Sequence, residues 1–255
     1  MLKTRLIPCL LISNGVCVKT LRFKNPCYLG DPINIVKIFN EKSVDEIMIL
    51  DVSSDRHIRL PDYDLIERIV SQAFMPVSFG GGIKTSAEAR RILSLGVEKV
   101  VVGNSLLESP EMVKELSSAV GAQSIVASVE VKQNFFSGYS VFTGSAKKAS
   151  RMSLSEVLTL INDLGVGEIF LQSIDHDGVM NGFDIDLISY VQKNSTLPVI
   201  ACSGAGHMGH IEELLKKVPV SAVAAGSMFV YFGKHKAVLI SYPSKQELVR
   251  YLNRG

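Results

Sequence analysis

The stretches that decide the fold are Ser78-Phe-Gly-Gly-Gly-Ile83 and Ala201-Cys-Ser-Gly-Ala-Gly206, which stand about 122 residues apart in a chain of 255. The same offset relates Asp45-Glu-Ile-Met-Ile-Leu50 to Gly167-Glu-Ile-Phe-Leu-Gln172, and Val101-Val-Gly-Asn-Ser105 to Ala224-Ala-Gly-Ser-Met228. A fixed period that carries whole strand–turn units indicates two similar halves. No linker rich in Pro, Gly or Ser separates them, so we expect one domain, with halves at about 1–121 and 122–243 and a closing helix at 244–253.

Short apolar runs alternate with helix-like segments along the chain. Runs rich in Val and Ile that stay apolar throughout are typical of parallel strands covered on both faces. We expect eight strands, at 5–12, 46–51, 76–80, 99–102, 124–131, 168–173, 198–202 and 222–225. Helical periodicity occurs at 62–73, 86–95, 110–120, 154–164, 184–193, 210–217 and 244–252. Asp31-Pro32 and Ser109-Pro110 each have the pattern of an N-cap followed by proline at the first helical position.

The order of these elements predicts a single (β/α)8 barrel, an α/β fold, with an internal duplication of half-barrels. Eight strand–helix units in a row give either a closed barrel or an open doubly wound sheet. The closed form usually has about 250 residues. Two halves of four strand–helix units each make eight units, so the internal repeat favours the closed barrel.

The composition narrows the class of protein. Apolar residues make up 47% and charged residues 20% of the chain, which excludes intrinsic disorder. A net charge of +2 gives no electrostatic footprint for nucleic acid or an anionic membrane. No apolar run approaches the roughly 18 residues that span a bilayer, and the N-terminal segment lacks the pattern of a signal peptide. We therefore expect a cytoplasmic protein.

The cysteines and histidines form no clear metal-binding pattern. The cysteines are Cys9, Cys17, Cys27 and Cys202. None forms a CxxC pair, and we expect Cys9 and Cys202 to be buried, reduced thiols in apolar strands. His176 lies between Asp175 and Asp177, which admits a metal site, but polar loop residues are the simpler interpretation because no ligand spacing repeats. We expect no metal and no other cofactor.

Glycine-rich loops follow four of the predicted strands. Their candidate phosphate-binding residues are Gly81, Gly82, Gly103, Asn104, Ser105, Ser203, Gly204, Gly206, Gly226 and Ser227. Glycine lets backbone N–H groups approach an anion, and a helix N-terminus adds the positive end of its dipole. Tight strand–helix turns would use the same residues. Four loops paired by the half-chain repeat nevertheless favour two phosphate sites that face each other across the barrel mouth.

Several motifs keep a specific order and spacing over nearly the whole chain. They are Arg5-Leu-Ile-Pro-Cys-Leu10, Gly30-Asp-Pro32, Asp45-Glu-Ile47, Leu50-Asp51, Gly80-Gly-Gly-Ile83, Ser173-Ile-Asp-His-Asp-Gly178 and Ser203-Gly-Ala-Gly206. Together they resemble the cyclase subunit of imidazole glycerol phosphate synthase. The resemblance implies a duplicated barrel with two phosphate sites, one of which includes Gly178. It also implies a glutaminase subunit at the barrel bottom, whose ammonia crosses to the top and attacks a bisphosphate substrate.

The same resemblance implies that ring closure relies on two aspartates, at the ends of strands 1 and 5. Leu11 stands at the first of these positions and Glu130 at the second. Leucine cannot carry a proton, so half of the acid–base pair is missing. Glutamate keeps the carboxylate but moves it by one methylene, and small displacements of a reacting group are costly. The other matching catalytic positions are Lys19, Asp51 and Asp177.

In the family, a ring of two basic and two acidic residues at the barrel bottom gates the ammonia path. The matching residues are Arg5, Glu46, Lys99 and Glu168, at the starts of strands 1, 2, 4 and 6. A structural salt-bridge ring is the alternative, because the bottom face of this fold usually serves stability. Buried charges are a weak way to stabilise a core, which favours the gate.

The four charged residues at the barrel bottom are retained, whereas the two aspartates at the top are replaced. In this respect the sequence resembles a divergent subgroup of the family, which is associated with acetamidino-sugar formation in bacterial surface polysaccharides. The implied partners are a glutaminase and an N-acetyl sugar amidotransferase at the barrel top, which converts an acetamido into an acetamidino group. Two alternatives remain open: a working cyclase of histidine biosynthesis that tolerates Leu11, and a non-catalytic scaffold. The glycine loops indicate a phosphorylated small-molecule ligand.

The long stretch 132–150 follows strand 5. A loop of this length is uncommon in a barrel and often functional. The family has a small hairpin at this point, with 138–143 as its second strand. Lys147 and Lys148 either reach a ligand or are solvated, and the sequence does not decide between these roles.

Overall fold

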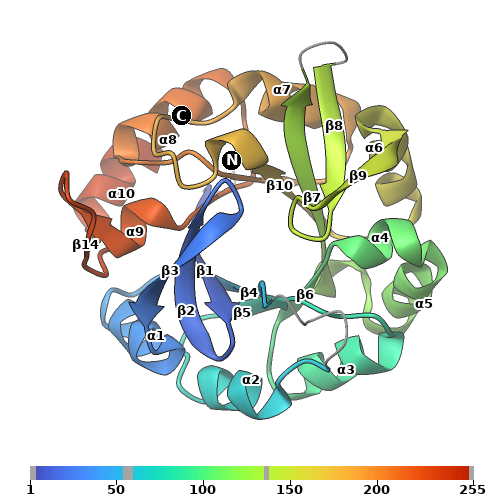
Figure 1. The fold of residues 1–255 in the computed structure, drawn as a ribbon, viewed down its shortest axis with the longest axis horizontal. Helices are drawn as coiled ribbons and strands as arrows, with labels where there is room; N and C mark the ends of the chain where they lie inside the picture. Colours follow the sequence, from blue (N-terminus) through green and yellow to red (C-terminus); the bar gives the residue numbers. More distant parts are fainter. Residues whose placement is uncertain (1–3, 54–59, 135–137, 253–255) are drawn as a thin grey trace.

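The computed structural model describes residues 4–53, 60–134 and 138–252. Within them, eight parallel strands close into a barrel (Figure 1), which confirms the predicted fold. In order round the barrel they are β1 (Arg5–Ser13), β4 (Ile47–Asp51), β5 (Val77–Gly80), β6 (Lys99–Val102), β7 (Ile125–Asn134), β10 (Glu168–Ser173), β11 (Val199–Cys202) and β12 (Ala222–Ala225). Strand β12 pairs back onto β1, with Arg5 opposite Ala222.

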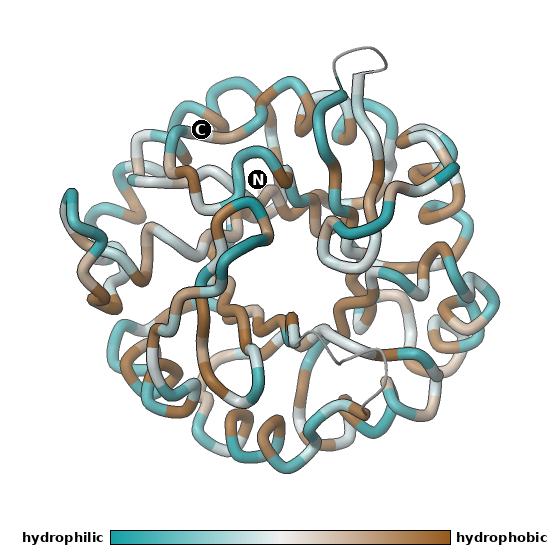
Figure 2. Tube along the Cα trace, in the orientation of Figure 1, coloured by the Kyte–Doolittle hydropathy of each residue, from teal (hydrophilic) through white to brown (hydrophobic). Residues whose placement is uncertain are grey.

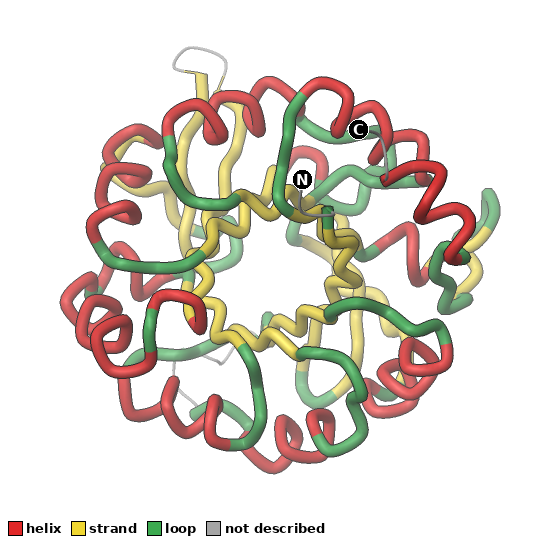
Figure 3. The backbone as a smooth tube through the Cα atoms, turned by 180° about the vertical axis from the view of Figure 1, so that it is seen from behind, coloured by secondary structure: helices red, strands yellow, loops and turns green. Residues whose placement is uncertain are grey.

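Helices form a layer outside the strands, as Figure 3 shows from the opposite side. The longer ones are α1 (Pro32–Glu41), α2 (Tyr63–Val70), α3 (Ser86–Ser94), α5 (Pro110–Val120), α6 (Leu154–Asp163), α7 (Ile185–Asn194), α8 (Met208–Lys217) and α10 (Lys245–Leu252). Two short helices, α4 (Asn104–Glu108) and α9 (Ser227–Val230), directly follow β6 and β12. Among the described residues, no helix is long and apolar enough to cross a membrane.

Side chains of the strands alternate between two cores. On β1, Leu6 and Leu10 point outward into the large apolar layer beneath the helices, whereas Ile7 and Cys9 point into the barrel. Figure 2 accordingly shows hydrophobic residues along much of the strand ring. A strand with apolar partners on both faces has no polar face to expose, which explains the continuous Val and Ile runs in the sequence.

Both predicted N-cap positions, Asp31 and Ser109, are confirmed, whereas one predicted helix start is corrected. Asp31 caps α1, because its side chain accepts the Asn34 N–H at 2.9 Å. Ser109 takes the N-cap position of α5, but its side chain makes no cap hydrogen bond. Ser109 is also the C-cap residue of α4, so its backbone (φ −151°, ψ 62°) lies at the junction of the two helices. Helix α8 begins at Met208 rather than His210, because His207 takes its N-cap position.

Two hairpins rise in front of the barrel in Figure 1. One continues β1 as β2 (Val16–Leu21) and β3 (Lys24–Gly30), and the other continues β7 as β8 (Gly138–Thr143) and β9 (Lys148–Ser153). The second confirms the predicted strand at 138–143. The first was missed, although Asn14-Gly15 is a strong hairpin signal. Both turn residues have the left-handed backbone of such turns, with φ of 52° and 80°.

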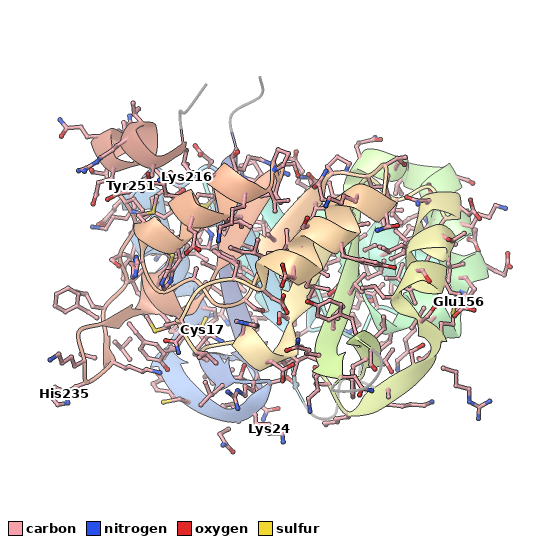
Figure 4. All side chains as sticks on the ribbon, turned by 90° about the horizontal axis from the view of Figure 1, so that it is seen from above. Cys17, Lys24, Glu156, Lys216, His235 and Tyr251 are labelled. Atoms are coloured by element: carbon pink, nitrogen blue, oxygen red, sulfur yellow. The ribbon has the colours of Figure 1, made fainter. Side chains whose placement is uncertain are left out.

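The two ends of the barrel differ in what they carry. In Figure 4, Lys24 of the first hairpin lies at one end, which we call the mouth. Lys216 of α8 and Tyr251 of α10 lie at the other end, which we call the bottom. A third, small hairpin of β13 (Tyr231–Phe232) and β14 (Ala237–Val238) projects at the side. The strands run from the bottom to the mouth, so both hairpins that extend barrel strands border the mouth.

Candidate functional site

A cavity of about 420 Å³ opens at the mouth. Its lining includes Cys9, Leu11, Lys19, Phe23, Leu50, Asp51, Gly81, Val101, Gly103, Asn104, Glu130, Ser145, Lys147, Asp177, Cys202 and Gly226. Strands β1 and β7 lie four strands apart in either direction round the barrel, so Leu11 and Glu130 occupy opposite walls, as predicted. The structure thus brings the five catalytic positions suggested by the sequence into one cavity.

Lys19 and Asp177 fasten the β2–β3 hairpin to the loop after β10. Lys19 is 7% exposed, and its Nζ donates a hydrogen bond to Asp177 Oδ1 at 2.8 Å. The Thr20 hydroxyl and the Phe23 N–H both donate to Asp177 Oδ2, at 2.9 and 3.2 Å. Gly178 lies against the same hairpin, where a Cβ atom would approach Thr20 O to 2.5 Å. Asp177 therefore fixes the position of this hairpin beside the cavity.

Glu130 and Asn104 hold the turn that joins β8 to β9. Glu130 Oε2 accepts the Ala146 N–H at 2.7 Å, and Asn104 Oδ1 accepts the Gly144 N–H at 2.8 Å. Hydrogen bonds from backbone N–H groups to a carboxylate are among the stronger ones in proteins. These contacts place the turn against the cavity wall.

Asp51 organises the start of the next loop. Its Oδ1 accepts hydrogen bonds from the Ser53 N–H at 2.9 Å and the Ser53 hydroxyl at 2.6 Å. Gly81 packs directly on Asp51, because a Cβ atom at Gly81 would approach Asp51 O to 2.5 Å. Gly81 and Gly82 line a smaller recess of about 190 Å³ beside the main cavity. Only glycine allows this close approach at φ +127°.

The structure divides the predicted phosphate-binding residues into two groups. Gly81, Gly103, Asn104 and Gly226 line the cavity, and Gly82 lines the recess beside it. The others lie outside the lining of both: Ser105, Gly178, Ser203, Gly204, Gly206 and Ser227. The glycine loops are therefore brought to the mouth, but only some of their residues face its open space.

The second group has mixed hydrogen bonding. The Ser105 hydroxyl donates to Ile83 O at 2.6 Å, and the Gly206 N–H donates to His210 Nδ1 at 3.1 Å. The Ser227 hydroxyl is buried and has no hydrogen-bond partner within the described residues. A buried hydroxyl in that state is costly unless a further group supplies a partner. The Ser227 hydroxyl is therefore available for an additional hydrogen bond.

At the bottom, Arg5, Glu46, Lys99 and Glu168 form a closed ring of alternating charge. Arg5 contacts Glu46 at 2.6 Å and also Glu168, whereas Lys99 contacts Glu168 at 2.9 Å and Glu46 at 3.6 Å. Burial alone would lower the pKa of Arg5, but the facing carboxylates of Glu168 and Glu46 outweigh it and raise that pKa. A fifth contact was not predicted from the sequence: the Ser78 hydroxyl donates to Glu46 Oε1 at 3.0 Å.

An apolar segment of the barrel interior lies between the ring and the mouth, and two of its residues, Cys9 and Val101, also line the cavity. It is built from Ile7, Cys9, Met48, Val101, Val126, Phe170, Ile200, Ala222 and Ala224. A charged molecule would lose its hydration in such a segment, whereas a small neutral molecule loses much less. Along the barrel axis, a charged ring at the bottom is therefore followed by an apolar middle and by charged side chains at the mouth.

The thiols of Cys9 and Cys202 and the imidazole of His176 have partners within the protein. Cys9 is buried as expected, and Cys202 is partly buried. A hydrogen bond with Cys202, followed by burial, raises the pKa of Cys9 well above its ordinary value. His176 Nδ1 is bonded to the Ser173 hydroxyl at 3.0 Å, while Asp177 binds the β2–β3 hairpin. Within the described residues, no three His, Cys, Asp or Glu side chains gather as metal ligands.

Comparison with known proteins places this geometry in a family. The family model described as "Histidine biosynthesis protein" matches residues 5–236. A Pseudomonas aeruginosa protein named "Putative imidazole glycerol phosphate synthase subunit hisF2" is 46% identical over 248 residues, which cover 97% of this chain and 99% of that protein. The imidazole glycerol phosphate synthase subunit HisF of Streptococcus mutans is 32% identical over 231 residues, with 91% and 92% covered. The chain therefore belongs to the histidine biosynthesis protein family and is similar to HisF subunits over almost its whole length.

Proposed function

We propose that this barrel passes ammonia from a glutaminase subunit at its bottom to an N-acetyl sugar amidotransferase at its mouth, for the formation of acetamidino sugars in surface polysaccharides. The observation that supports the proposal is a difference between the bottom and the mouth of the barrel. The charged ring of Arg5, Glu46, Lys99 and Glu168 is complete, whereas Leu11 removes a proton carrier from the mouth.

The axis suits ammonia because ammonia must stay neutral to react. At neutral pH free ammonia is mostly protonated, and the ammonium ion is no nucleophile. The apolar segment between ring and cavity favours the neutral form. The ring is closed in this structure, and its longest contact is the 3.6 Å between Lys99 and Glu46. We infer that ammonia enters when Lys99 moves away from Glu46.

The bottom surface presents an aromatic side chain that suits docking of a partner. Phe74 is 88% exposed, on the loop between α2 and β5. Asn40 holds this loop from both sides: its Nδ2 donates to Gln72 O at 2.7 Å and its Oδ1 accepts the Phe74 N–H at 3.0 Å. Because the backbone at Phe74 is already fixed, the loop loses less conformational entropy on binding, and aromatic residues often anchor interfaces. We infer that Phe74 contacts the glutaminase subunit.

The experiment that tests the proposal compares nitrogen sources. The glutaminase, this barrel and the amidotransferase are combined, and the amidinated sugar is measured with glutamine and with excess ammonium. We expect product from glutamine only when the barrel is present, and product from ammonium with or without it. Equal product from both sources, with and without the barrel, would instead indicate a scaffold.

The alternative function is cyclisation in histidine biosynthesis, and one observation favours it. Lys19, Asp51, Glu130 and Asp177 share a cavity, as a working cyclase would require. We expect the purified chain, given ammonium salt and the family's bisphosphate substrate, to form little or no imidazole product, because Leu11 carries no proton. Leu11→Asp combined with Glu130→Asp should then restore some turnover. Robust cyclisation by the unmodified chain would support the alternative.

A further inference from the structure

The turn between β8 and β9 has an unusual backbone for its residues. Gly144, Ser145 and Ala146 all have left-handed conformations, with φ of 68°, 56° and 62°. Glycine adopts this region freely, but serine and alanine do so only where the surroundings fix them. Ser145 and Lys147 of this turn line the mouth cavity. The turn is therefore held in a disfavoured shape at the place where it forms part of the cavity wall.

Two side chains from the barrel supply the fixing contacts. Asn104, at the start of α4, accepts the Gly144 N–H at 2.8 Å. Glu130, on β7, accepts the Ala146 N–H at 2.7 Å. Glu130 pairs with Phe142 in the β7–β8 register, so its side chain must reach beyond that pair to the turn. Glutamate is one methylene longer than aspartate, which suits this reach.

The β2–β3 hairpin, on the other side of the mouth, is held in the same way. Its turn residues Arg22 and Phe23 also have left-handed backbones, with φ of 51° and 61°. Asp177 accepts the Phe23 N–H on its carboxylate and the Arg22 N–H on its backbone oxygen. Two strained turns thus border the mouth, and a carboxylate from the barrel binds a backbone N–H in each.

We propose that Glu130 is a positioning residue: its carboxylate holds the 144–147 turn in place, so that Ser145 and Lys147 form the wall that meets an anionic ligand. This assigns the carboxylate a role in shaping the cavity in place of proton transfer. The inference deepens the proposed function, because a mouth without either proton carrier delivers ammonia and does not consume it. Its first test, however, does not depend on ammonia transfer.

That test is amide hydrogen exchange of the full chain, followed by mass spectrometry or NMR. Glu130→Ala removes the acceptor, and we expect the Ala146 amide to exchange at least about tenfold faster. Glu130→Gln keeps an acceptor oxygen of similar reach, so exchange should stay within about threefold of the unmodified chain. Asn104→Ala should release Gly144 in the same way. Glu115→Ala, at an exposed position of α5, is the matched control and should change neither amide.

A second measurement separates positioning from proton transfer. In the glutamine-dependent assay described above, Glu130→Gln should keep most of the product formed by the unmodified chain, and Glu130→Ala should lose about tenfold. Unchanged exchange at Ala146 in Glu130→Ala would overturn the holding role. Loss of product in Glu130→Gln with the amide still protected would overturn the positioning role in favour of acid–base chemistry. Failure of the unmodified complex to form product would count against the proposed function, and the exchange result would still decide the role of Glu130.

Discussion

The bottom and the mouth of this barrel use charged residues in different ways. At the bottom, Arg5, Glu46, Lys99 and Glu168 neutralise one another across the barrel axis. At the mouth, the carboxylates of Glu130 and Asp177 bind the backbone of hairpin turns instead. The charges at the bottom satisfy one another, whereas those at the mouth fix the backbone of turns that border the cavity. Residues of the same type therefore have different roles at the two ends, and their surroundings decide which.

The largest expected effect comes from removing one acidic residue of the ring. The Glu46 side chain is 6% exposed and contacts both Arg5 and Lys99. Glu46→Ala leaves two partly buried cations with one carboxylate, and we expect a loss of about 3 kcal/mol in the free energy of unfolding, at the low end of the cost of breaking a buried pair. Urea denaturation measures this, with Glu115→Ala as a control expected to change it by less than about 0.5 kcal/mol. A loss below about 1 kcal/mol for Glu46→Ala would mean that the ring is not a buried charge network.

A smaller effect is expected at the mouth. Gly178→Ala places a Cβ 2.5 Å from Thr20 O at a φ of +72°, so it strains the backbone and pushes the β2–β3 hairpin. We expect a loss of about 2–3 kcal/mol in the free energy of unfolding. Gly15→Ala has a similar φ of +80° but meets nothing within 4 Å, so it should cost only about 1 kcal/mol. Equal losses in the two variants would show that the contact between Gly178 and the hairpin contributes nothing.

The next prediction concerns docking at the bottom and should leave the mouth unchanged. Phe74→Ala should weaken binding of the glutaminase subunit by about tenfold or more, measured by isothermal titration calorimetry, because it removes an aromatic anchor. Phe232→Ala, at a side chain 66% exposed on the small β13–β14 hairpin, is the control and should bind normally. If both variants bind as well as the unmodified chain, the partner does not use Phe74.

Most of the fold could be predicted from the sequence because it depends on local patterns. The Val- and Ile-rich runs located all eight barrel strands, and the repeat indicated closure. The hairpin strands β2 and β3 were missed, although the Asn14-Gly15 turn that joins β1 to β2 is a local signal. The short helices α4 and α9 gave no comparable signal, because five and four residues do not establish a helical period.

The candidate site was predictable in position but not in its contacts. Residues that end parallel strands must meet at one end of a barrel, so Leu11 and Glu130 could be placed on the same cavity. The binding of Phe23 by Asp177 joins residues 154 positions apart in the chain, and no local pattern encodes it. The Ser78 contact to Glu46 also joins residues far apart in the chain. A serine within a strand gives no sign of its partner. Side-chain partners across a barrel follow from tertiary packing.

The central claim is that the ring admits ammonia to a conduit, and Lys99→Ala tests it most directly. Lys99 contacts both glutamates of the ring, so its loss removes the side chain that we propose moves to admit ammonia. The measurement is amidinated sugar formed by the three-protein complex with glutamine, relative to that formed with excess ammonium. We predict at least about a tenfold fall in this ratio for Lys99→Ala and none for the exposed control Lys114→Ala. An unchanged ratio in Lys99→Ala would contradict the account.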